Sequence, residues 1–163
     1  MSTKPLSQNS QFNPPADVRT RNSAGALSRV VVILGRVLFA AIFLMSGPTH
    51  FSHQTIAYAA SQGVPFAGLL VPFSGVLAFL GGLSILTGYR TRLGAWLIVL
   101  FLVPVTLTLH KFWGIADPIV AQMQMAMFMK NISMLGAALL FTYFGAGPIS
   151  FDERRLTHQA QRA

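Results

Sequence analysis

Lys130 and Asn131 place a charge and an amide well inside an apolar stretch that runs from Met123 to Gly145. The stretch is typical of a membrane-spanning helix, where a charge costs several kcal/mol unless another group compensates it. No predicted span contains an Asp or Glu, so Lys130 needs backbone carbonyls, water, a route to the membrane surface or a bound anion. Either the pair binds a ligand inside the bundle, or Lys130 extends to the outer surface while Asn131 bonds a neighbouring helix.

Histidines are the other candidates for chemistry. His110 can exchange protons near neutral pH, or it can be an interfacial histidine bonded to a backbone carbonyl. His50 and His110 lie at similar predicted depth and could ligate a b-type haem, but Pro48 makes the segment around His50 irregular, which argues against haem. His50 and His53 have only Asp117 as a plausible third ligand, so no metal site is expected.

Composition indicates a membrane protein of one domain. The chain has 163 residues, of which 53% are hydrophobic and 10% are charged, and its net charge is +8. Most Lys and Arg residues flank hydrophobic spans, which argues against nucleic-acid binding and for contact with anionic lipid. The chain has no cysteine, which excludes disulfides, thiol redox chemistry and thiolate metal sites.

The elements that must position these residues are four transmembrane helices, so the predicted fold is an all-α integral membrane four-helix bundle. Small residues spaced four apart, at Ala78 and Gly82 and at Ser84 and Gly88, predict close helix packing. The predicted spans cover about residues 30–47, 65–87, 93–112 and 123–145, within a membrane domain of residues 29–147. Residues 1–28 form a polar tail expected to be disordered, and residues 148–163 form a short basic tail.

The distribution of basic residues predicts the orientation. Nine of the twelve Lys and Arg residues fall on the side that holds both tails and the turn at Arg90 and Arg92. By the positive-inside rule both termini are expected to be cytoplasmic. This arrangement puts Lys130, His110 and His50 in the outer half of the bundle. Arg36 lies near the basic side, where it can bind a phosphate, a lipid headgroup or a quinone, reach back to the interface or stabilise the inner end of the bundle.

From Arg36 onward the chain resembles the DoxX family of small four-helix membrane proteins. The pieces that carry the resemblance are Arg36 with Phe43-Leu44-Met45-Ser46-Gly47, Gly81-Gly82, Gly88-Tyr89-Arg90-Thr91-Arg92, His110 with Phe112-Trp113 and Asp117, Phe128 with Lys130-Asn131 and Leu135-Gly136, and Gly145-Ala146-Gly147-Pro148 with Ser150 and Asp152. The resemblance implies a bacterial or archaeal cell membrane. It also implies a link to quinol-oxidase or thiosulfate:quinone oxidoreductase subunits, or to complexes concerned with oxidative stress.

The functional hypothesis is therefore an accessory or quinone-interacting subunit of a membrane redox complex. In it Lys130 and Asn131 bind the ligand oxygens, with His50 and Arg36 as further candidate ligand-binding residues. His110 exchanges a proton, and Asp117 orients His110 or balances Lys130. The expected partners are membrane lipid and other membrane or redox subunits, and a homo-oligomer is compatible with the pattern. The alternative is a non-catalytic membrane scaffold or a small-molecule transport component.

Overall fold

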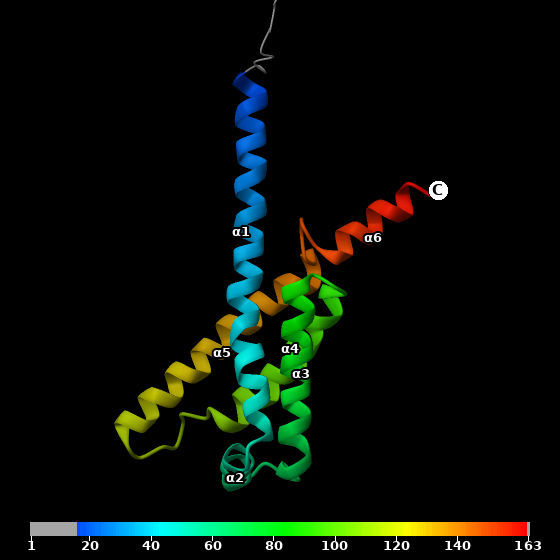
Figure 1. Ribbon diagram of the computed structural model, residues 1–163. Helices are drawn as coiled ribbons and strands as arrows, with labels where there is room; N and C mark the ends of the chain where they lie inside the picture. The colour runs from blue at the N-terminus through cyan, green and yellow to red at the C-terminus, as the bar shows by residue number, and fades with distance from the viewer. Residues whose placement is uncertain (1–15, 163) are drawn as a thin grey trace, which may run out of the picture.

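A computed structural model describes residues 16–162, and every regular element in that part of the chain is helical (Figure 1). Four of the helices are long and apolar enough to cross a membrane, over Gly25–Phe51, Ala67–Thr87, Thr91–Leu109 and Pro118–Phe144. The predicted all-α architecture with four spans is confirmed. In chain order the elements are α1 (Ala16–Ser46), η1 (a 3₁₀ helix, Gly47–Phe51), α2 (His53–Ser61), α3 (Ala67–Thr87), α4 (Thr91–Leu109), α5 (Pro118–Phe144) and α6 (Phe151–Ala160).

Helix α1 begins earlier than the sequence pattern indicates. It starts at Ala16, so the prediction of a disordered tail is wrong for residues 16–28, while residues 1–15 lie outside the described part of the chain. No proline occurs between Pro15 and Pro48. Extending an existing helix adds one hydrogen bond for each residue fixed, so the polar segment continues the helix that the membrane span nucleates.

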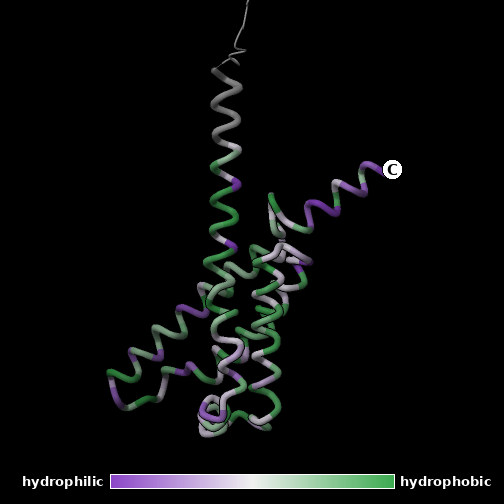
Figure 2. Tube along the Cα trace, in the orientation of Figure 1, coloured by the Kyte–Doolittle hydropathy of each residue, from purple (hydrophilic) through white to green (hydrophobic). Residues whose placement is uncertain are grey.

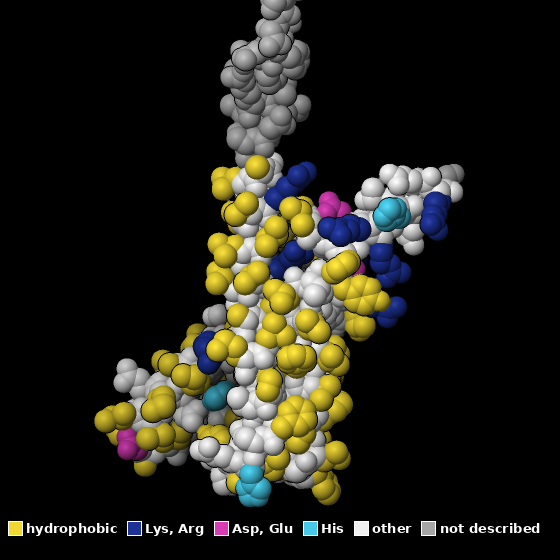
Figure 3. All heavy atoms as spheres, in the orientation of Figure 1, with side chains coloured by type: hydrophobic (Ala, Val, Ile, Leu, Met, Phe, Trp, Pro, Cys, Tyr) yellow, Lys and Arg dark blue, Asp and Glu magenta, His cyan; other side chains and the backbone are white. Residues whose placement is uncertain are grey.

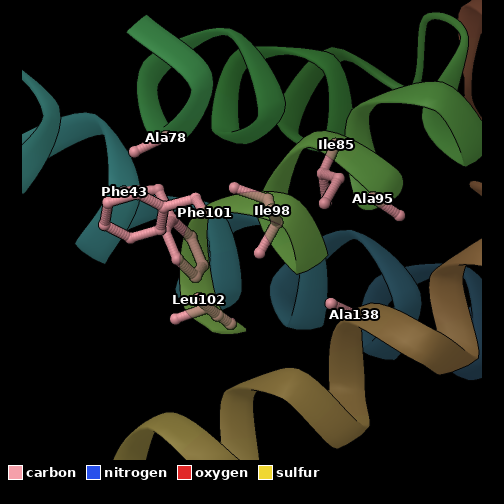
Figure 4. Packing of buried hydrophobic residues seen from close by; sticks show 8 residues of the cluster. All are labelled: Phe43, Ala78, Ile85, Ala95, Ile98, Phe101, Leu102 and Ala138. Atoms are coloured by element: carbon pink, nitrogen blue, oxygen red, sulfur yellow. The ribbon is translucent and has the colours of Figure 1, made fainter. Parts of the chain in front are cut away.

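The core lies where the four long helices meet. Helix α3 packs against α1 and α4, and α5 packs against α4 while crossing the bundle obliquely (Figure 1). Rings of Phe43 and Phe101 meet edge to face with centroids 6.2 Å apart, and this packing continues to Ala138 of α5 (Figure 4). The buried cluster consists of Phe43, Ala78, Ile85, Ala95, Ile98, Phe101, Leu102 and Ala138.

Glycines on α3 allow its neighbours to approach closely, as the spacing of small residues predicts. A Cβ atom on Gly82 would lie 3.0 Å from Cβ of Phe43, and one on Gly81 would lie 2.9 Å from the carbonyl oxygen of Gly94. Gly88 has a different role, because it has a φ of 69° and faces Ser150 of the C-terminal segment. Close backbone contact therefore joins α3 to α1 and α4, while Gly88 leaves room for the chain that follows α5.

Two elements at one end of the bundle differ from the sequence prediction. The segment expected to be a loop after the first span contains η1 and the short helix α2, which Ser52 caps by accepting a hydrogen bond from the Thr55 amide at 3.3 Å. Helix α5 begins at Pro118 rather than Met123, with Asp117 as its N-cap. Capping side chains mark the starts of α2 and α5.

The two ends of the bundle differ in charge. Lys and Arg side chains gather along α6 and around the neighbouring part of α1 (Figure 3), and we call this the basic end. The opposite end, which holds η1, α2 and the α4–α5 connection, is the far end. Between them the long helices are mainly hydrophobic, whereas α6 is largely hydrophilic (Figure 2). Both described ends of the chain lie at the basic end (Figure 1). Their cytoplasmic location stays a prediction.

Candidate functional site

A cavity of about 430 Å³ lies at the far end between η1, α2, α3 and α4. Its wall is mainly apolar, and several of its residues, including Leu70, Phe73 and Leu107, are exposed on the outside of the bundle. In a membrane this outer surface faces lipid. The lining residues are His50, Thr55, Ala59, Gln62, Gly63, Val64, Pro65, Leu70, Val71, Phe73, Ser74, Leu77, Leu100, Phe101, Pro104, Val105, Leu107, Thr108, Leu109 and Lys111.

His50 is held in one orientation in the cavity wall. Its Nδ1 lies 2.9 Å from the carbonyl oxygen of Ser46, and its ring meets the ring of Phe101 nearly edge to face at 5.5 Å. Because a carbonyl can only accept, Nδ1 carries the proton and the Nε2 of the neutral ring is an acceptor. In the described part of the chain Nε2 has no hydrogen-bond partner.

Gly75 allows His50 to occupy this position. A Cβ atom on Gly75 would lie 2.6 Å from Cβ of His50 and 2.7 Å from the carbonyl oxygen of Gly47. Distances below 3.0 Å are not tolerated without movement. Only glycine at position 75 therefore lets η1 pack directly on α3 and carry the imidazole into the cavity wall.

Most other polar groups in the wall are already bonded within their own helices. The hydroxyls of Ser74 and Thr108 donate to the carbonyls of Val71 and Pro104, each at 2.7 Å. Proline lacks the amide hydrogen that would bond the carbonyl four residues earlier, so Pro104 frees the carbonyl of Leu100 within the same wall. The groups in this wall without a hydrogen-bond partner among the described residues include His50 Nε2, this carbonyl, the Gln62 side-chain amide and the exposed ammonium of Lys111.

His110 forms a separate polar chain at the far end. Its Nδ1 lies 3.0 Å from Oε1 of Gln124, and Nε2 of Gln124 donates to the hydroxyl of Tyr58 at 3.4 Å. The amide oxygen accepts, so His110 also carries its proton on Nδ1. This chain joins the end of α4 to α5 and α2. Sequence reasoning did not pair these residues, which lie on three different elements.

Asp117 caps α5 and does not contact the histidine. Its Oδ1 accepts hydrogen bonds from the amides of Ile119 at 2.8 Å and Val120 at 3.2 Å. No hydrogen bond joins it to His110 or Lys130 among the described residues. The structure thus gives Asp117 a capping role, which the following Pro118 at the first helical position accompanies.

Lys130 and Asn131 point in different directions. Asn131 is 5% exposed and lies on the buried face of α5 with Ala138. Lys130 is exposed, and its Nζ donates to the sulfur of Met127 at 3.3 Å. Because α5 turns its Asn131 face inward, the two side chains do not converge on one place inside the bundle. Neither residue lines the cavity.

At the basic end Arg36 connects α1 to the chain that follows α5. It is 4% exposed, and its guanidinium donates to the carbonyls of Ala146 at 3.3 Å and Ile149 at 2.8 Å. Its Nε is buried without a partner. Asp152 completes this junction: its two oxygens accept from the amides of Arg90 and Thr91 at 2.8 and 2.9 Å. Of the alternatives for Arg36, these contacts favour stabilisation of this end of the bundle.

The described residues contain no group of three or more His, Cys, Asp or Glu side chains that could hold a metal ion. His50 and His110 each use Nδ1 in a hydrogen bond and keep Nε2 for other contacts. The cavity residues that sequence reasoning missed are Lys111 as a lining residue and Gly75 as a positioning residue. Their signal was weak because α2, which closes one side of the cavity, is not apparent from hydropathy.

The four packed apolar helices define a multi-pass α-helical membrane protein. The chain belongs to the DoxX family, whose model, described as DoxX, matches residues 31–111. It is 30% identical over 132 residues to the inner membrane protein YphA of Escherichia coli, covering 80% of this chain and 94% of that protein. It is 31% identical over 128 residues to the inner membrane protein YqjF of the same organism, covering 77% and 92%.

A eukaryotic protein shows a more limited similarity. An ER-derived vesicles protein of Saccharomyces cerevisiae is 30% identical over 83 residues, which are 51% of this chain and 26% of that protein. No solved structure matches the chain. The inner membrane location of the bacterial relatives, with the four apolar helices, confirms the predicted multi-pass protein of the cell membrane.

Proposed function

We propose that this DoxX protein is a quinone-interacting subunit of a membrane redox complex and that the far-end cavity binds the quinone head group. The observation that carries the proposal is His50, whose Nδ1 is held by Ser46 and whose Nε2 is unpartnered in an apolar wall. Small-molecule sites are mainly apolar with few convergent polar groups, and their volumes run from about 300 to 1,000 Å³. The cavity volume of about 430 Å³ falls in this range.

The position of the cavity suits a lipophilic ligand. Leu70, Phe73 and Leu107 line it and are exposed on the surface that faces lipid. A quinone dissolved in the bilayer can therefore enter between α3 and α4 without crossing water. The apolar wall would take the ring, while the ammonium of Lys111 would donate to a carbonyl oxygen of the quinone.

His50 is proposed as the proton acceptor for the reduced ligand. A quinol hydroxyl donates to Nε2 of His50, and oxidation of the quinol to the quinone releases two protons and two electrons. One proton passes to His50 and the other to water at the far end. The electrons pass to a redox-active partner subunit. His110, fixed by Gln124, stays the candidate for proton exchange with the outer surface.

Quinone binding by variants at two histidines tests the proposal. The protein in nanodiscs is titrated separately with decylubiquinone and with its reduced form, decylubiquinol. The dissociation constants are compared between wild type, His50→Phe and His53→Phe. Phenylalanine retains a ring against Phe101 but lacks the nitrogen acceptor. His53 is exposed and outside the cavity lining, which makes it the matched control.

We expect His50→Phe to weaken quinol binding, measured with decylubiquinol, by about 5- to 150-fold, because a lost hydrogen bond in a buried site costs about 1–3 kcal/mol. The control variant should bind like the wild type. Equal affinities in all three proteins would refute the assignment to His50.

The alternative of a non-catalytic scaffold or a small-molecule transport component has one observation in its favour. Helix α5 has the smallest share of buried residues among the four spans, with 11% of its most apolar stretch buried. A scaffold would use such a surface to contact other proteins. A protein that binds no quinone in the titration, yet remains associated with a membrane partner, would support this alternative.

A further inference from the structure

One face of α5 combines small side chains with an uncompensated charge. Ala126, Lys130 and Ser133 follow one another at helical spacing, and all three are exposed. Ala137, which is half-buried, continues this face one turn further along the helix. We call these four residues the Lys130 face.

Lys130 lies at a depth where lipid cannot accommodate its charge. It comes twelve residues after Pro118 and fourteen before Phe144, about 18 and 21 Å along the helix axis. Lysines near helix ends extend to the membrane surface, but this one is central in its span. Its only bonded acceptor among the described residues is the Met127 sulfur, which is a weak acceptor.

A second copy of the chain cannot provide the missing negative charge. The four acidic residues, Asp17, Asp117, Asp152 and Glu153, all lie outside the membrane-spanning segments. A symmetric contact through the Lys130 face would also bring two ammonium groups together, which is unfavourable.

We propose that the Lys130 face is the docking surface for a transmembrane helix of another protein, and that this helix carries an Asp or Glu at mid-membrane depth. Charge complementarity identifies the occupant, because a carboxylate is the group that neutralises an ammonium in hydrocarbon. The small side chains allow the two helix backbones to approach closely. This docking surface would join the chain to a partner in the redox complex proposed above, so it rests on that proposed role. It does not depend on the quinone site.

Site-specific cross-linking in native membranes tests this inference. A photoreactive amino acid replaces Ala126 on the Lys130 face, or Ile132 as the control. Ile132 is also exposed, but it lies two residues from Lys130 and so points to nearly the opposite side of the helix. The adducts are quantified in wild-type and Lys130→Met backgrounds, and the cross-linked peptides are sequenced.

We expect an adduct from position 126 that falls at least tenfold in the Lys130→Met background and is absent from position 132. The sequenced peptide should be a hydrophobic span with an Asp or Glu. Lys130→Asp should abolish the adduct, and exchange of that partner carboxylate for Lys should restore it. Lys130→Met removes a charge from an exposed position, so the variant should still fold.

Three results would overturn the inference: no adduct from position 126, an adduct with a second copy of this chain, or an adduct unaffected by Lys130→Met. Quinone titration of the same variants separates this inference from the proposed function. Lys130→Met should keep the wild-type affinity for decylubiquinol, whereas His50→Phe should lose affinity for it and keep the adduct.

Discussion

Replacing Arg36 with Met should release the C-terminal segment from the bundle without unfolding the membrane core. Methionine retains a long unbranched side chain but removes the two donors that bind the carbonyls of Ala146 and Ile149. Hydrogen bonds to charged groups contribute about 1.5–3 kcal/mol each. Relief of the cost of burying a charge offsets part of this loss. We therefore expect the docking of residues 145–162 to weaken by about 2–4 kcal/mol.

Hydrogen exchange measures this change directly. The amides of Arg90 and Thr91 donate to the Asp152 carboxylate, and the amide of Asp152 donates to the Gly88 carbonyl. These amides exchange only when the segment leaves. A loss of 2–4 kcal/mol should raise their exchange rates by roughly 30- to 700-fold.

Two comparisons make the result specific. Arg29→Met removes an exposed charge from the same helix and should leave the three amides unchanged. The amide of Ile98, in the buried core, should keep its protection in both variants. If Arg36→Met exchanges like the wild type at the junction amides, Arg36 does not hold the segment. If Ile98 also loses protection, the two ends of the bundle do not open independently.

Three further substitutions test other contacts. Gly75→Ala should displace His50, because the added Cβ would lie 2.6 Å from the histidine Cβ, and both quinol affinity and thermal stability should fall. Gly68→Ala, on the same helix with nothing within 4 Å, should leave both unchanged. Asp117→Ala should lower the free energy of unfolding by about 1 kcal/mol through loss of the cap while quinone affinity stays at the wild-type value; a large loss of affinity would show that the carboxylate has a ligand role. Asp152→Asn should accelerate exchange of the two backbone amides at the start of α4, since one of them would face an amide NH₂ group, and unchanged exchange would contradict this.

The membrane spans and some helix caps could be predicted from the sequence because hydropathy and capping depend on residues close together in the chain. Each of the four spans is recovered within a few residues except at the start of α1 and α5. The Ser150 cap also follows from the sequence: its hydroxyl accepts from the Glu153 amide at 3.1 Å. Glu153 departs from the usual capping box, since its carboxylate accepts from the Ile149 amide rather than from Ser150.

The orientation of α5 could not be predicted because its sequence lacks a clear apolar stripe. Periodicity shows which residues share a face, but a helix that is apolar on most sides can present any of them to its neighbours. The structure turns Asn131 inward and leaves Lys130 outside. The hydrogen-bond partners of Arg36 could not be predicted for another reason. Ala146 and Ile149 are more than a hundred residues away in the chain, and backbone carbonyls have no sequence signature.

The use of hydrogen-bonding groups distinguishes the two ends of the bundle. At the basic end Arg36 and Asp152 are bonded to backbone groups, so a ligand there would have to replace contacts that hold the chain together. At the far end His50 bonds the backbone through one ring nitrogen and keeps the other, and Lys111 is exposed in the same cavity wall. This difference supports the proposal that the ligand binds at the far end. The contacts at the basic end instead hold the C-terminal segment against α1 and the start of α4.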